Sequence, residues 1–378
     1  MTQNISMDEP AAHSSTPSAD IKPRRILSID GGGIRGLIAV EVLCEIEAIL
    51  RERHARPNMV LADHFDMVAG TSTGAIIAAA LCLGMSCSEL RGFYMEGGAK
   101  MFEPSHFYER FKYKYKDEML SAQLRDVFGA DTRLGSDKLR CLLMLIVRNS
   151  NADETWTITN NPHSPYNARS RADCQLDLPL WQLVRASEAA PSFFPPEVMN
   201  LGGKDLVFVD GSVSSYCNPA FQAVMQATAK PFGLLWATGP QALELVSVGT
   251  GLAPHRRSEL QADDVNLLYD ATVLPGSLIL SSVIEQDFLC RLFGQCRHGL
   301  PMDKILGDMV GMPAPSGDNL FSYVRYNVEL SARGLQQIGI SDIEPEDVQL
   351  IDSVEHIESL TRIGKAVAAH HVRPEHLI

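Results

Sequence analysis

The stretch RILSIDGGGIRG, residues 25–36, decides the fold of this chain. Residues 25–29 form a short, β-rich apolar run that ends in Asp30 and three consecutive glycines, a pattern typical of a buried strand that enters a turn. Apolar residues then recur at helical spacing from Leu37 to Leu50. The stretch therefore predicts a strand, a glycine-rich loop and a helix.

A second unit repeats this order further along the chain. Residues 65–69 (FDMVA) predict a strand, residues 70–74 (GTSTG) a glycine-bracketed turn and residues 75–83 an apolar helix. Parallel strands need crossover connections, so this alternation predicts a mainly parallel sheet. The expected fold class is α/β, a three-layer α/β/α sandwich. Further strands are expected at residues 141–147, 155–159, 206–209 and 243–248.

Three regions are expected along the chain. Residues 1–22, rich in Ser, Ala, Pro and Asp, predict a disordered leader and lack the features of a signal peptide. Residues 23–250 form the expected core. Residues 251–378 predict a mostly helical C-terminal part packed on that core, which ends in one amphipathic helix over residues 344–370.

Composition excludes several classes of protein. The net charge of −13 argues against binding of DNA or RNA, which needs a basic surface. The eight cysteines are scattered without the spacing of a zinc site or a disulfide framework, which is typical of a reduced cytosolic protein. The most apolar stretch, residues 68–83, is too short and too polar to span a bilayer. No EF-hand-like ligand cluster is present in the sequence, so no metal is expected.

The turn at Gly70-Thr71-Ser72-Thr73-Gly74 is a GxSxG motif between a predicted strand and a predicted helix. In a nucleophile elbow this turn exposes the serine, and the start of the following helix favours developing negative charge. The alternative is a glycine-rich turn capped by a hydroxyl side chain. The strand and helix on either side favour the elbow, with Ser72 as nucleophile.

The loop Asp30-Gly31-Gly32-Gly33-Ile34-Arg35-Gly36 also lies between a predicted strand and a predicted helix. Its backbone N–H groups are able to converge on an anion, either an oxyanion or a phosphate. The same glycines spell the dinucleotide fingerprint GxGxxG, which requires an acidic residue at the end of the next strand. That strand instead ends at Ala69 and Gly70. An oxyanion hole is therefore favoured over a nucleotide site.

A third motif, Asp210-Gly211-Ser212, follows the predicted strand at residues 206–209. A carboxylate at the carboxyl edge of the sheet would lie on the same side as the elbow and the glycine loop. The alternative, an aspartate that caps a turn, is common. The three motifs together indicate one site.

In their order and composition, DGGGIRG, GTSTG and DGS resemble the motifs of the patatin-like phospholipases. Residues 186–191 (ASEAAP), Phe193-Phe194-Pro195 and Asn218-Pro219 extend the resemblance, which covers about residues 24–250. It implies a Ser–Asp dyad in which Ser72 attacks an ester and Asp210 accepts its proton, without a cofactor. It also implies an oxyanion hole at Gly31, Gly32, Gly33 and Arg35. Ser212 departs from the usual Gly or Ala.

Three alternatives to this enzyme stay open. A Ser–His–Asp triad would recruit His298, His356 or His370. A regulatory module would bind a nucleotide at the glycine loop and perform no covalent chemistry. A hydrolase of soluble esters or of a protein substrate would share the nucleophile and leave membranes intact.

The segment Arg110-Phe-Lys-Tyr-Lys-Tyr-Lys116 alternates cations with aromatic residues. Such a segment suits a membrane surface, where lysine meets anionic headgroups, and equally a nucleotide. The alternative is an ordinary solvated loop. With a lipid substrate, the protein is expected in the cytoplasm, in peripheral contact with membrane phospholipids at the inner face.

In its length and in the patterns at Tyr323–Asn327 and Ile363–Lys365, the chain also resembles the patatin effectors of bacterial antiphage signalling (CBASS) that cyclic dinucleotides activate. That resemblance implies an allosteric activator such as 3′,3′-cGAMP, bound away from the acyl site. Candidate contacts lie in residues 100–116 and 160–175, Arg169 and Arg171 among them. The oligomeric state is open, a homo-oligomer included.

Overall fold

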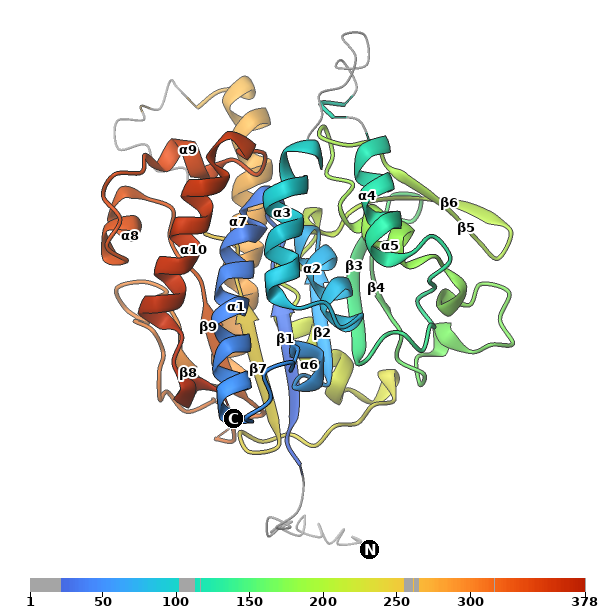
Figure 1. Ribbon diagram of the computed structural model, residues 1–378, viewed down its shortest axis with the longest axis horizontal. Coiled ribbons are helices and arrows are strands. Elements are labelled where there is room, and N and C mark those ends of the chain that lie inside the picture. Colours follow the sequence, from blue (N-terminus) through green and yellow to red (C-terminus); the bar gives the residue numbers. More distant parts are fainter. Residues whose placement is uncertain are drawn as a thin grey trace, which may run out of the picture.

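A nine-stranded sheet, counted over the residues that the structure describes, forms the centre of the molecule (Figure 1). The structure is a computed structural model that describes residues 22–101, 113–115, 117–254, 261, 265–315 and 317–377. The strand order is β5-β6-β3-β2-β1-β7-β9-β8, and β4 also pairs with β3. The strands are β1 (Arg24–Ile29), β2 (Met67–Thr71), β3 (Leu142–Asn149), β4 (Glu154–Thr159), β5 (Glu197–Leu201), β6 (Lys204–Asp210), β7 (Leu243–Val248), β8 (Gln295–His298) and β9 (Ser322–Tyr326).

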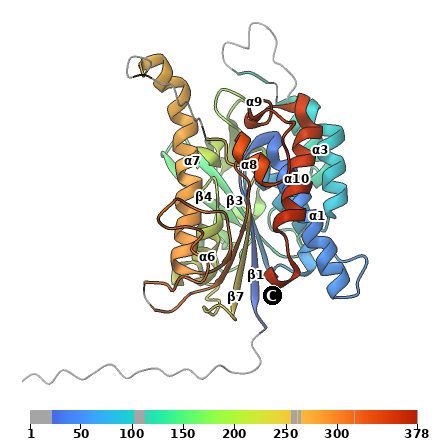
Figure 2. The same ribbon diagram turned by 90° about the vertical axis from the view of Figure 1, so that its left-hand side faces the viewer.

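Helices cover both faces of the sheet, so the fold is the expected three-layer sandwich (Figure 2). One face carries α1 (Gly36–Arg53), α2 (Thr73–Cys82), α3 (Cys87–Met101), α4 (Glu118–Phe128), α5 (Leu180–Ser187) and α10 (Ile357–His371). The other face carries α6 (Ala220–Thr228) and α7 (Leu267–Phe293). Two short helices, α8 (Ala332–Gln337) and α9 (Pro345–Gln349), lie between β9 and α10.

The central strands are mostly apolar because both of their sides are buried. On β1, Leu27 and Ile29 belong to the core beneath α1, while Ile26 belongs to the core beneath α6. All three side chains are fully buried. A parallel strand between two helical layers has this near-continuous apolar sequence, which is why residues 25–29 were recognisable as a strand.

Every strand expected from the sequence is present, and the sheet is mainly parallel. β1, β2, β3, β7, β8 and β9 are mutually parallel. The strand before Asp210 was expected to run parallel to the others, and this expectation is wrong, because β6 runs antiparallel to β3. Three strands were not expected, namely β5, β8 and β9.

The C-terminal part contains two strands besides the expected helices. It is mostly helical, yet β9 and β8 extend the central sheet beyond β7, so this part completes the sandwich. The single helix expected over residues 344–370 is wrong at residues 350–356, where it is interrupted. The chain forms α9, leaves the helix at Leu350 and resumes as α10 at Ile357. The expected leader, residues 1–22, lies outside the described residues except for Lys22.

Candidate active site

Ser72 stands at a sharp turn between β2 and α2. Its backbone has φ 55° and ψ −129°, a strained conformation for a residue with a side chain. Strain of this kind is the mark of a nucleophile elbow, where it projects the hydroxyl from the turn. The next residue, Thr73, opens α2, so the helix N-terminus lies directly behind the serine.

The glycines of the elbow are required by close packing. A Cβ atom on Gly74 would lie 2.3 Å from the carbonyl oxygen of Ile29, and one on Gly70 would lie 2.0 Å from the carbonyl oxygen of Gly74. Both distances are far inside van der Waals contact. The GxSxG spacing therefore lets α2 start directly against the end of β1.

Asp210 reaches the serine from the opposite direction. β6 approaches antiparallel to β3 and ends with Asp210 paired to Val147, one residue beyond the level of Thr71 on β2. The Ser72 hydroxyl donates a hydrogen bond of 2.7 Å to Oδ2 of Asp210, and the backbone N–H of Ser212 donates one of 2.7 Å to Oδ1. The sequence placed the carboxylate at the correct site, although the strand that carries it is not parallel.

Burial sets the proton affinity of this pair. Ser72 is 5% exposed and Asp210 is 2% exposed. Burial raises the pKa of Asp210 to about 6, and the hydrogen bonds from Ser212 and Ser72 limit the rise. A carboxylate with a raised pKa is a better base than a solvated one and is still ionised at neutral pH.

Ser187 is a positioning residue that the sequence reasoning missed. Its hydroxyl accepts a hydrogen bond of 2.9 Å from the backbone N–H of Ser72 and donates one of 2.7 Å to the carbonyl of Ile146. Ser187 thereby ties the elbow to β3. It lies in the ASEAAP segment that contributed to the family resemblance, which was the available signal.

The glycine loop offers two backbone donors to the site. The N–H of Gly31 donates to the carbonyl of Cys217 and that of Ile34 to the carbonyl of Ile351. Within the described part of the chain, the N–H groups of Gly32 and Gly33 have no such acceptor. A Cβ on Gly31 would lie 3.2 Å from Cβ of Ser72, so the loop lies against the serine. We therefore narrow the expected oxyanion donors to Gly32 and Gly33.

Gly33 could not be replaced by another residue in this loop. It has φ 59°, and a Cβ there would lie 2.1 Å from the carbonyl oxygen of Ile351. Both the left-handed backbone and the contact with the C-terminal segment require glycine.

Arg35 is placed to hold the loop rather than to bind an oxyanion. Its guanidinium donates to the carbonyl of Gly32 at 3.4 Å and to the carbonyl of Gln349 at 3.2 Å. Burial lowers its pKa to about 10, so it remains a cation at neutral pH. The break between α9 and α10 supplies these contacts, because residues 349 and 351 turn their carbonyls to Arg35 and Ile34.

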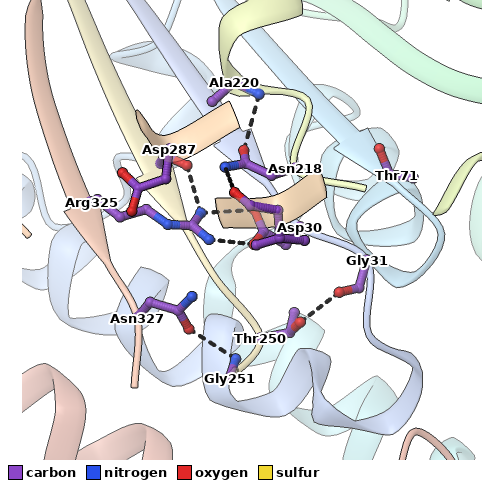
Figure 3. A network of polar contacts seen from close by, with 12 residues as sticks. Asp30, Gly31, Thr71, Asn218, Ala220, Thr250, Gly251, Asp287, Arg325 and Asn327 are labelled. Carbon is purple, nitrogen blue, oxygen red and sulfur yellow. Dashed lines mark hydrogen bonds and ion pairs between the residues drawn. The ribbon is translucent and has the colours of Figure 1, made fainter. Parts of the chain in front are cut away.

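The C-terminal part also contacts the first residue of the glycine loop, Asp30 (Figure 3). Arg325 of β9 forms a buried bidentate ion pair with Asp30, with one hydrogen bond of 2.8 Å, and also donates to Ser247. The hydroxyl of Thr250 donates to the carbonyl of Gly31 at 2.6 Å. Arg325, which follows the expected core, therefore helps to position the loop together with Thr250, the last residue of that core.

Glu188 is a buried acid next to this machinery. It is 6% exposed, and its Oε1 has no hydrogen-bond partner among the described residues. Burial and the neighbouring Asp210 raise its pKa to about 8. Its side chain lines a small cavity together with Gly33, Thr73 and apolar side chains that include Ile76 and Phe194. Glu188 is therefore mostly a neutral acid at pH 7.

No histidine joins the dyad in the part of the chain that the structure describes. His298 stacks on His376 with ring centroids 4.8 Å apart, His356 faces Asp347 and His370 contacts the carbonyl of Ala366. Both oxygens of Asp210 are already engaged by Ser72 and Ser212. The geometry thus favours the dyad over the triad.

Of the two segments predicted to bind a headgroup or a nucleotide, residues 100–116 lie largely outside the described residues and residues 160–175 are described in full. Of residues 110–116, the structure describes only 113–115, where the hydroxyl of Tyr115 donates to Asp352 at 2.6 Å. Arg169 pairs with Asp177 and Arg171 with Asp173 at the surface. Any anion bound there would compete with these carboxylates.

The part of the chain that holds the site matches a known family. The model of the patatin-like phospholipase family matches residues 27–224, just over half of the chain. The chain belongs to the patatin-like phospholipase family. The match contains Ser72, Asp210 and the glycine loop and ends before β7, β8 and β9.

Individual relatives agree with this assignment. Patatin-17 of Solanum cardiophyllum is 29% identical over 243 residues, and patatin-16 of Solanum tuberosum is 28% identical over 245 residues. Each match covers 60% of this chain and 60% of the relative. The solved structure of VipD from Legionella pneumophila overlaps 91% of this chain and 67% of its own, at 13% identity and a TM-score of 0.34.

Proposed function

We propose that this protein is a lipid acyl hydrolase of the phospholipase A type that cleaves acyl esters of glycerophospholipids. The observation that carries the proposal is the hydrogen bond of 2.7 Å from Ser72 to Asp210 at a strained elbow. The N–H groups of Gly32 and Gly33 in the adjacent glycine loop, which have no backbone acceptor among the described residues, support it. The family to which the chain belongs agrees with it.

In the proposed reaction, Oγ of Ser72 attacks the ester carbonyl while its proton moves to Asp210. Charge develops on the carbonyl oxygen, which the N–H groups of Gly32 and Gly33 and the N-terminus of α2 stabilise. The bond to the glycerol oxygen then breaks, and Asp210 returns the proton to that oxygen. Water attacks the acyl-Ser72 ester while its proton moves to Asp210. The bond between the acyl group and Oγ of Ser72 then breaks, Asp210 returns the proton to Oγ, and the fatty acid leaves.

The decisive experiment measures fatty acid release from phospholipid liposomes by wild type, Ser72→Ala and Asp210→Asn. We expect the wild type to release fatty acid and both variants to lose at least about a thousandfold in rate, because each lacks one half of the dyad. A fluorophosphonate should label the wild type and fail to label Ser72→Ala. Hydrolysis by Ser72→Ala at the wild-type rate would refute the proposal, and labelling without liposome hydrolysis would favour soluble esters.

We further propose cytoplasmic action at the inner face of the membrane, switched on by a cyclic dinucleotide such as 3′,3′-cGAMP in antiphage defence. This rests on the resemblance to CBASS effectors, and the low exposure of Ser72 supports the need for a step that opens the site. The liposome assay repeated with a panel of cyclic dinucleotides tests it. Equal activity with and without every nucleotide would contradict it.

A further inference from the structure

The first half of α7 is an apolar helix surface with little protein against it. Residues 271–284 contain no charged side chain, in a chain whose net charge is −13. Leu274 and Leu278 are 50% and 68% exposed, and they lie one turn apart on the same face of the helix. Ile284 is 40% exposed further along.

The helix does not have the environment of a core helix. Val273–Phe293 is long and apolar enough to cross a membrane by length and composition, yet only 17% of its most apolar 18 residues are buried in the protein. A core helix of the same composition would be mostly buried. An exposed apolar surface of this kind is typical of a site that contacts an apolar partner.

The topology places this surface at the same edge of the sheet as Ser72. α7 ends at Phe293, directly before β8, and β8 is parallel to the chain of strands that leads to β2. The C-terminal end of α7 thus lies at the amino edge of the sheet, and its N-terminal end lies at the carboxyl edge, where Ser72 follows β2. Figure 2 shows these first turns projecting past the sheet, at the same end as α9.

We infer that the N-terminal half of α7 is the membrane-docking element of this protein and inserts Leu274 and Leu278 among the acyl chains of a phospholipid bilayer. The inference rests on the proposed function, because the lipid ester must reach Ser72 from a bilayer. An uncharged helix of about 21 Å suits the boundary between headgroups and acyl chains. The partner is a bilayer and not an acidic surface, since no cation lies within the uncharged stretch.

The test uses flotation with vesicles of phosphatidylcholine alone, in a Ser72→Ala background so that the lipid survives. Leu274→Glu/Leu278→Glu should lower the vesicle-bound fraction by about tenfold or more, because two carboxylates replace two leucines that insert among the acyl chains. Leu235→Glu is the matched control. Leu235 is 61% exposed, and the adjacent Trp236 packs on Arg24 at the start of β1, the opposite edge of the sheet. This control should bind like the parent, and high salt should not release either protein.

With Ser72 restored, the double variant should hydrolyse a soluble short-chain nitrophenyl ester at the wild-type rate and lose about tenfold on vesicles. Unchanged vesicle binding by the double variant would overturn the inference, as would binding that requires anionic lipid and disappears in high salt. A wild-type dimer that the double variant converts to monomers would also overturn it, by assigning the surface to a second copy. Normal vesicle binding without any ester hydrolysis would count against the proposed function alone.

Discussion

In the proposed reaction, Asp210 accepts a proton from a hydroxyl in a place that water barely reaches. Its burial and its two hydrogen bonds leave it with a pKa of about 6. In this state it is ionised at neutral pH and holds a proton more strongly than a solvated carboxylate. The pair can therefore work without histidine, provided that the glycine loop stabilises the oxyanion.

The first prediction concerns the pH dependence of the reaction. Protonated Asp210 cannot accept the Ser72 proton, so kcat/KM for a soluble ester should fall as pH falls through about 6 and level off above it. Circular dichroism at each pH should show that the fold persists. A kcat/KM that stays constant from about pH 4.5 to 7.5 would contradict the role of Asp210 as base.

The second prediction concerns Glu188 and stability. Its pKa is raised from 4.5 to about 8, so the folded protein keeps a proton there that the unfolded chain releases. The free energy of unfolding should therefore decrease as pH rises from about 4.5 to about 8. Glu188→Gln is neutral at every pH, so its melting temperature should exceed that of the wild type more at about pH 9 than at about pH 5.5.

The control for this measurement is Glu346→Gln, an exposed residue in the first turn of α9. Its melting temperature relative to wild type should not change with pH in this way. If the Glu188→Gln difference is the same at both pH values, Glu188 is not the buried acid that its geometry indicates.

At the scale of elements, the interruption between α9 and α10 is part of the active site. The chain leaves α9 after Gln349, and the carbonyls of Gln349 and Ile351 accept hydrogen bonds from the glycine loop. Asp352 accepts a hydrogen bond from the hydroxyl of Tyr115. An uninterrupted helix would have used those carbonyls in its own hydrogen bonds. The apolar periodicity of residues 344–370 predicted a continuous helix because it reports burial and carries no information about these contacts.

The third prediction separates positioning by Arg35 from ordinary stabilisation. Arg35→Met removes the contacts with Gly32 and Gln349 at the start of α1, so kcat should fall by about tenfold while KM for a soluble ester changes little. Arg53→Met is the matched control, because Arg53 donates to the carbonyls of Leu377 and Pro374 at the other end of α1. It should lower the melting temperature similarly and leave kcat unchanged. Equal kcat in both variants would refute the positioning role.

At the scale of the whole molecule, the part of the chain that matches the family and the part that follows it depend on each other. Residues 27–224 carry the serine, the aspartate and the loop. The pair between Asp30 and Arg325 links the root of the loop to β9, about 300 residues away along the chain. β9 and β8 also extend the sheet past β7. The last third of the chain is therefore structurally part of the catalytic unit.

The fourth prediction tests this link. Arg325→Met leaves Asp30 buried without its cation, so the free energy of unfolding should fall by about 3–5 kcal/mol, as measured by urea denaturation. Adding Asp30→Asn should recover a large part of that loss, since the uncompensated charge disappears. Additive losses in the double variant would show that the pair contributes nothing beyond its separate side chains.

The sequence by itself determined the strand, loop and helix at residues 25–50, the elbow at Ser72, the aspartate that follows residues 206–209 and the resemblance to the family. These features are local: a buried parallel strand is apolar on both sides, and a tight turn needs glycine where another backbone comes within van der Waals contact. Only the tertiary structure decided which strand direction brings Asp210 to Ser72, that Ser187 holds the elbow, and that Gln349, Ile351 and Arg325 support the glycine loop. Those contacts join residues more than a hundred positions apart, and the side-chain pattern of a segment carries no record of its distant partners.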